Sequence, residues 1–131
     1  MLYTQSLMVP PSTLLIDAAV ETIQLTYGRI QYIWLHFPPG CRGQVYVALF
    51  RSLTQIAPAT PGQGIALDDV LFGFPTDLVL DEPPYQLQLA GWAPVSSFAH
   101  TITVHVALDV STQPNAPQTP QSLLARLAGL F

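Results

Sequence analysis

The residues of this chain best suited to acid–base or metal chemistry are its three histidines, His36, His100 and His105. His100 and His105 are five residues apart, so a regular strand would point their side chains to opposite faces of a sheet. A zinc site would then need His36 to join one of them, together with a further ligand. We therefore interpret all three as strand histidines, and we expect neither a metal nor another cofactor.

Two pairs of adjacent acids, Asp68-Asp69 and Asp81-Glu82, are candidates for hydrolysis or calcium binding. A glycosidase needs two carboxylates that face one cleft at a set separation. Adjacent acids on a strand point apart, so such a site would have to combine acids from two segments. Both pairs lie beside expected turns, where aspartate is common because its side chain bonds to the backbone. We favour this turn role.

Cys41 is the only cysteine, and it lies in a Pro/Gly-rich loop beside Arg42, whose charge could lower the pKa of a thiol. No catalytic base is implied nearby, and the chain contains no nucleophile elbow, phosphate loop or metalloprotease motif. A lone cysteine also cannot form an internal disulfide. We expect the protein to be no enzyme and to have no small-molecule substrate.

Aromatic side chains suggest one binding function. Trp34 and Trp92 lie on expected strands, and several tyrosines lie near them. Exposed aromatics and amides on a β-sandwich could stack on a sugar and hydrogen-bond to it, although aromatics also fill cores and interfaces. The alternative function is therefore a glycan-binding, or receptor-binding, module in which Trp34 and Trp92 are exposed around a shallow groove.

The composition favours a subunit of an assembly. A length of 131 residues suggests one domain. Charged residues make up only 9% of the chain, against roughly 25% in average globular proteins. There is no lysine and no basic patch, so we expect neither nucleic acid nor a membrane as a partner. No signal peptide is evident, and no apolar run approaches the roughly 18 residues that span a bilayer. With so few charged residues, electrostatic repulsion between molecules is weak, and we expect the chain to bury much of its surface against partners.

The middle of the chain has the pattern of a β-sandwich. Residues 101–109 alternate, with Ile102, Val104, Val106 and Leu108 on one face. Residues 30–37 are apolar on both faces, which predicts a central strand covered on both sides. Further strands are predicted over residues 22–27, 44–50, 53–57, 64–69, 70–74, 77–81 and 85–92. Strands this dense, separated by Pro/Gly turns, predict a single antiparallel sandwich of jelly-roll type over residues 18–110.

Two terminal segments flank this predicted domain. Residues 1–17 are expected to form an extended arm, residues 111–120 a Pro-rich linker, and residues 121–131 a short amphipathic helix. That helix would be too short to be stable alone in water, so it must pack on its own domain or on a neighbouring subunit. The residues that we expect at subunit interfaces are Leu2, Tyr3, Leu7, Met8, Leu123, Leu124, Leu127, Leu130 and Phe131.

Residues 37–69 and 85–108 give the chain a resemblance to small β-sandwich structural proteins of virions, namely head-decoration or minor capsid proteins of tailed phages. The resemblance covers about residues 22–110 and consists of strands and Pro/Gly loops. It implies a virion localisation, a symmetric homo-oligomer such as a trimer or another small ring, contacts with other virion subunits, and terminal arms that clasp neighbours. It carries over no catalytic residue. The sequence leaves open whether the host structure is a capsid, a tail or a cellular assembly.

Overall fold

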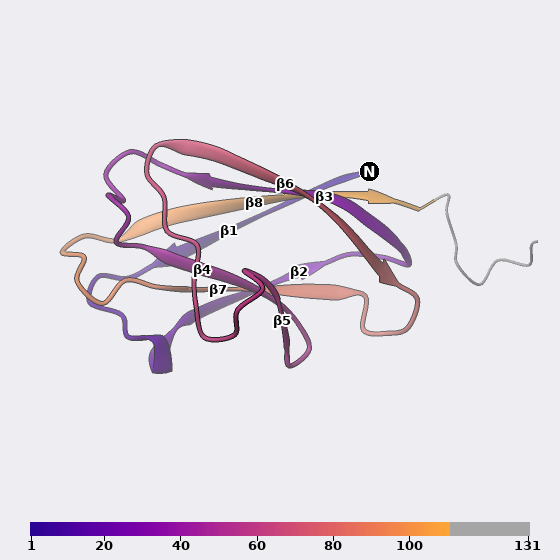
Figure 1. Ribbon diagram of the computed structural model, residues 1–131, viewed down its shortest axis with the longest axis horizontal. Coiled ribbons are helices and arrows are strands. Elements are labelled where there is room, and N and C mark those ends of the chain that lie inside the picture. Colours follow the sequence, from indigo (N-terminus) through magenta and orange to yellow (C-terminus); the bar gives the residue numbers. More distant parts are fainter. Residues whose placement is uncertain (111–131) are drawn as a thin grey trace, which may run out of the picture.

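The computed structural model describes residues 1–110 as two facing antiparallel sheets of four strands each (Figure 1). The predicted linker over residues 111–120 and the predicted helix over residues 121–131 lie outside these described residues. The elements are β1 Leu2–Val9, the 3-10 turn η1 Leu15–Asp17, β2 Ala19–Gln24, β3 Gly28–Phe37, β4 Tyr46–Arg51, β5 Thr54–Ala57, β6 Val70–Leu80, β7 Gln86–Trp92 and β8 His100–Asp109. Sheet I has the order β1-β8-β3-β6, and sheet II has the order β2-β7-β4-β5. The predicted all-β, two-sheet fold is confirmed.

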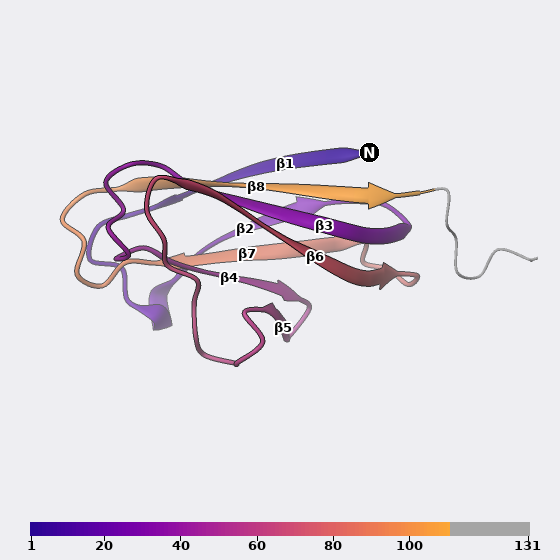
Figure 2. The same ribbon diagram turned by 45° about the horizontal axis from the view of Figure 1, so that its top comes forward.

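The hydrophobic core lies between the two sheets, which stack as separate layers in Figure 2. On β8 every second side chain is buried, as the alternation of residues 101–109 predicted. From sheet II, Leu87 and Leu89 of β7 and Leu49 of β4 are fully buried against them. The buried apolar area of these inward faces is the main term that stabilises the sandwich. The inward-facing residues of β8 are Ile102, Val104, Val106 and Leu108.

The first residues are part of the sandwich, and the prediction of an arm over residues 1–17 is wrong. Strand β1 pairs along its whole length with β8, from Leu2 opposite Ala107 to Val9 opposite His100. Leu7 is 3% exposed and Val9 is fully buried in the core. Polar Gln5 lies among the inward-facing positions of this strand, so the sequence lacks the regular alternation of apolar and polar residues that predicts a strand. Burial of its inward side chains and pairing with β8 hold it in sheet I.

The segment after β1 is also tied to the sandwich. Thr13 forms a two-way backbone bridge with Ala93, and its hydroxyl donates to the carbonyl oxygen of Pro10 at 2.6 Å. Residues 10–18 therefore carry the chain from sheet I to sheet II and do not extend away from it. The domain begins at the first strand and not at residue 18.

Strand β3 is central in sheet I, between β8 and β6, but only one of its faces is covered. Ile33, Leu35 and Phe37 point into the core and are fully buried. The other face, with Trp34 and His36, points outward, and no described element packs over it. The expectation of a strand covered on both sides is therefore wrong for residues 1–110, and the outward apolar residues of β3 need another explanation.

Candidate interaction surfaces

The outer face of sheet I has an uncharged centre, which we call the Trp34 face. Three rows of directly paired residues cross the four strands there. None of their twelve positions holds Asp, Glu or Arg, and charges begin at the sheet end, where Arg29 pairs with Asp77. The Trp34 face consists of Leu2, Ala107, Tyr32 and Pro75 in the first row, Thr4, His105, Trp34 and Gly73 in the second, and Ser6, Thr103, His36 and Leu71 in the third.

Trp34 and Tyr32 form the aromatic centre of this face. Their ring centroids lie 4.6 Å apart with the planes tilted by 45°. The two rings cover the backbone of Gly73 on β6: a Cβ at that residue would lie 2.6 Å from Trp34 Cδ1 and 2.8 Å from Tyr32 Cε2. The missing side chain of Gly73 is therefore what lets the two aromatic rings pack against the backbone of β6.

Hydroxyl and imidazole groups surround these aromatics. His105 Nδ1 lies 2.9 Å from the hydroxyl of Thr4 on β1, and the hydroxyls of Ser6 and Thr103 lie 3.1 Å apart. These hydrogen bonds link β1 to β8 across the outside of the sheet. The Trp34 face thus combines aromatic rings with hydroxyl and imidazole groups and contains no Asp, Glu or Arg.

The outer face of sheet II contains an apolar groove of about 680 Å³, which we call the sheet II groove. Leu15 of η1 and Val20 of β2 line one end, Ala90 of β7 lies on the floor, and Phe50 and Leu53 of the β4–β5 hairpin line the other end. Leu53 is 98% exposed and Val20 54%, so the apolar walls are in contact with solvent. None of the thirteen lining residues is Asp, Glu, Arg, Lys or His.

Trp92 also lines this groove, but its own ring is mostly covered. It stacks on Tyr46 with centroids 5.9 Å apart and planes 11° apart. The backbone of Gly64 lies over the Trp92 ring and beside Tyr46, because a Cβ there would lie 2.8 Å from Trp92 Cζ2 and from Tyr46 Cβ. Trp92 is left 7% exposed.

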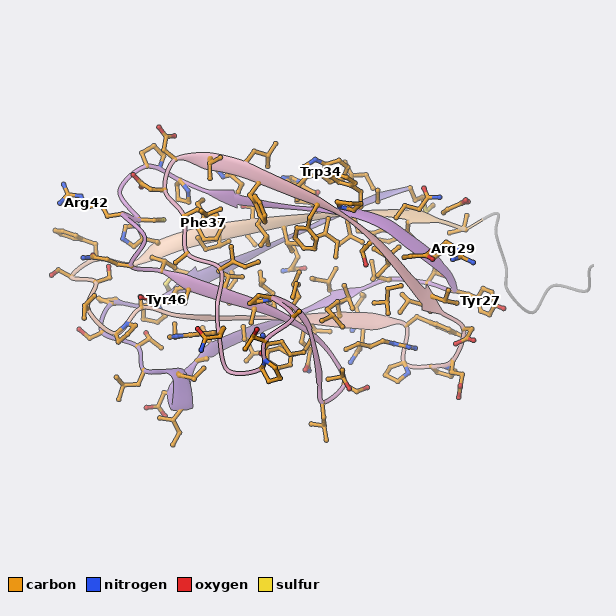
Figure 3. All side chains as sticks on the ribbon, viewed as in Figure 1. Tyr27, Arg29, Trp34, Phe37, Arg42 and Tyr46 are labelled. Carbon is orange, nitrogen blue, oxygen red and sulfur yellow. The ribbon has the colours of Figure 1, made fainter. Side chains whose placement is uncertain are left out.

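The two tryptophans therefore do not form one sugar site. Trp34 points out of sheet I, whereas Trp92 belongs to the outer side of sheet II; Figure 3 labels Trp34 on one layer and Tyr46, the stacking partner of Trp92, on the other. The predicted glycan site with both Trp34 and Trp92 exposed around a groove is wrong, because strand alternation sends them to opposite sides of the sandwich.

The predicted interface residues of the first strand are in three different environments. Leu2 and Met8 point outward and are 64% and 57% exposed, so both are available to a partner. Tyr3 is half-buried and packs against the core. Leu7 is buried inside its own sandwich, which overturns its assignment to an interface. The remaining predicted interface residues, Leu123, Leu124, Leu127, Leu130 and Phe131, lie outside the described residues.

Of the four acids singled out in the sequence, Asp68 has the turn role that was predicted, because its side chain bonds to the backbone. Asp68 Oδ1 accepts hydrogen bonds from the backbone N–H groups of Gly40 and Arg42, each at 3.0 Å. It thereby holds the loop that contains Cys41, whose side chain is fully buried. Burial, and then the nearby charge of Asp68, raise the pKa of the Cys41 thiol, which is the opposite of what a nucleophile needs. Within residues 1–110, no cluster of three or more His, Cys, Asp or Glu is arranged to hold a metal ion.

Neither the comparison with protein-family models nor the comparison with curated proteins gives a match for this chain. Among residues 1–110, no helix is long and apolar enough to cross a membrane.

Proposed function

We propose that this protein is a non-enzymatic structural subunit that assembles through the outer faces of its sandwich. The observation that carries the proposal is the absence of Asp, Glu and Arg from the centre of the Trp34 face and from the sheet II groove. Residues 1–110 also expose fourteen large apolar side chains. Soluble monomers rarely expose large contiguous apolar patches, and a symmetric homo-oligomer, such as a trimer or another small ring, would cover them.

We further propose that the two sheets form a jelly roll. The strands pair as β1 with β8, β2 with β7, β3 with β6 and β4 with β5, all antiparallel. This nested pairing is what a long hairpin of eight strands gives when it is rolled up around its β4–β5 tip. Double-sheet jelly rolls occur in viral capsid and lectin domains, so this topology supports a virion role and a glycan-binding role alike.

Among assembly proteins, we propose a virion subunit, that is, a capsid decoration protein or a minor structural protein. Its support is the resemblance over about residues 22–110 together with the proposed jelly roll. The partners would be further copies of the chain and adjacent virion subunits. The role is mechanical: apolar area buried between subunits stabilises the particle.

The oligomer is tested by sedimentation velocity and native mass spectrometry of the full chain. We expect one closed oligomer; a monomer at micromolar concentration would overturn the proposal. Three matched substitutions locate the interface: Ser6→Asp on the Trp34 face, Ser52→Asp in the sheet II groove and Ser97→Asp in an exposed loop. At least one of the first two should raise the dissociation constant about tenfold or more, since a buried unpaired charge is costly, whereas Ser97→Asp should not.

A second candidate function rests on the Trp34–Tyr32 pair and its ring of hydroxyl and imidazole groups. A sugar ring could stack on these aromatics while Thr4, Thr103 or His105 bonds to its hydroxyls. A glycan array probed with the full chain tests this function. Binding that is lost in Trp34→Ala would support it. An array without signal, or binding that survives Trp34→Ala, would remove it.

A further inference from the structure

We propose that the sheet II groove receives residues 121–131 of a neighbouring copy of this chain. This inference rests on the proposed assembly function and names the contact that links one subunit to the next. It starts from the groove, whose apolar walls are exposed to solvent. Its occupant should be an apolar segment with little charge and with the length of the groove.

Residues 121–131 have this chemistry. Their sequence, QSLLARLAGLF, contains one charged residue, Arg126, and spaces its large side chains so that a helix would gather them on one face. The groove contributes no charged or imidazole group from any of its thirteen lining residues. An apolar helix face would therefore bury no charged or imidazole group of the groove, whose polar lining residues are Ser52, Thr54, Gln55 and Gln88. The residues of that face are Leu123, Leu124, Leu127, Leu130 and Phe131.

The length of the segment also fits. The groove runs across β2, β7, β4 and β5, from Val20 on β2 to Gln55 on β5. Three steps between neighbouring strands, at about 4.8 Å each, give roughly 14 Å. A helix over residues 123–131 rises roughly 13 Å at 1.5 Å per residue. The segment would therefore span the sheet from the η1 wall to the hairpin wall.

The position of the end of β8 favours a neighbouring copy over the same copy. Asp109 pairs with Arg29 at the start of β3, at the end of the sandwich where Gln24 pairs with Gln86. The groove is on the outer face of the other sheet and extends along the strands from Gln88, roughly 7 Å beyond Gln86, to Trp92, roughly 20 Å beyond it. Figure 1 shows β8 ending at the side of the molecule away from η1.

To reach the Leu15 end of the groove on its own copy, the terminal segment would need almost the full extended length of residues 111–122. That path adds the separation of the sheets, about 10 Å, and the side chains on both outer faces to the distance along the strands. Residues 111–122 reach roughly 40 Å when extended, and prolines at positions 114, 117 and 120 disfavour the bends that a path around the sandwich edge needs. A groove on an adjacent subunit requires no such bend.

The test uses the full chain with Leu127 replaced by the photo-crosslinking residue p-benzoylphenylalanine. Copies labelled with 14N and with 15N are mixed in denaturant, refolded together and irradiated, and the crosslinked peptides are identified by mass spectrometry. We expect crosslinks to residues around Val20, Leu53 and Ala90, with mixed-isotope pairs present. If every crosslinked peptide pair carried a single isotope, the assignment to a neighbouring copy would be wrong. If the crosslinks were confined to another surface, the assignment to the sheet II groove would be wrong.

Two adjacent residues of η1 provide a matched control. Leu15 lines the groove, whereas Ile16 is 86% exposed and does not. Leu15→Asp should lower the crosslink yield about tenfold or more, and Ile16→Asp should leave it unchanged; equal yields would overturn the assignment. Native mass spectrometry of the same samples separates the two proposals. An oligomer with crosslinks elsewhere contradicts only this inference, whereas a monomer contradicts the assembly function.

Discussion

The indole of Trp34 lies against the backbone of Gly73 on the neighbouring strand, in the space that a side chain at residue 73 would occupy. A methyl group there would lie 2.6 Å from Trp34 Cδ1, well inside van der Waals contact. The uncharged centre of the Trp34 face therefore depends on a residue that has no side chain.

Gly73→Ala should destabilise the protein by about 1–3 kcal/mol, because the added methyl forces the two aromatic rings off the sheet. Urea unfolding followed by tryptophan fluorescence measures this loss. In a Trp34→Ala background the same substitution should cost less by at least about 1 kcal/mol, since the nearer of the two obstructing rings is gone. Additive effects of Gly73→Ala and Trp34→Ala would contradict the packing described here.

Leu7→Ala should lower the free energy of unfolding by about 2–5 kcal/mol, because Leu7 is 3% exposed and its removal leaves a cavity in the core. Leu2→Ala, on the exposed face of the same strand, is the control and should change stability by about 0.5 kcal/mol or less. Chemical denaturation of both variants decides the matter. Two equally small effects would mean that β1 is not part of the sandwich.

Cys41 should react with Ellman's reagent on the order of 100-fold more slowly in the folded chain than in urea, because the buried thiol must first be uncovered. Burial and Asp68 raise its pKa above the ordinary value of 9.0. The folded chain thus holds the thiol proton more tightly than the unfolded chain. The resulting stabilisation is complete below the unfolded pKa and is lost as the pH rises through the raised folded-state pKa.

Unfolding measurements between pH 7 and pH 10 should therefore show a decline in stability that is smaller in Cys41→Ala. The same decline in both proteins would mean that this thiol is not the group responsible.

Asp68→Ala should cost about 1–2 kcal/mol, because two backbone N–H groups in the loop of Gly40 and Arg42 lose their acceptor. Asp68→Asn keeps a carbonyl oxygen in the same place and should cost less than half as much. Thermal unfolding of the two variants compares them. An equal loss in both would assign the effect to the carboxylate charge and not to the hydrogen bonds.

The sequence predicted those strands that have one solvent-exposed face and one buried face. Residues 101–109 are the clearest case, since Val104 and Val106 point inward as their spacing required. Strand β1 was not predicted from the pattern, because the polar residue Gln5 occupies one of its inward-facing positions. As an edge strand, β1 also needs fewer apolar residues than a central strand. Part of the alternation, with Leu7 and Val9 buried, was nevertheless present in the sequence.

The candidate surfaces were less predictable, because they depend on which strands share a sheet. Trp34 and Trp92 look equivalent in the sequence, and only the strand order places them on opposite sides of the sandwich. The sheet II groove combines residues from η1, β2, β7 and the β4–β5 hairpin, which no local pattern connects. The backbone of Gly64 covers Trp92, and this contact likewise joins segments that are distant in the sequence.

The pairing of β1 with β8 brings the first residue next to the end of the last strand: the amino group of Met1 donates to the carbonyl oxygen of Leu108 at 2.9 Å. A short linker could therefore join residue 110 to residue 1 without disturbing either sheet. New termini could then be opened near Gly62, in the exposed loop between β5 and β6. Such a circular permutant would present its termini at the rim of the sheet II groove and leave the strand order unchanged.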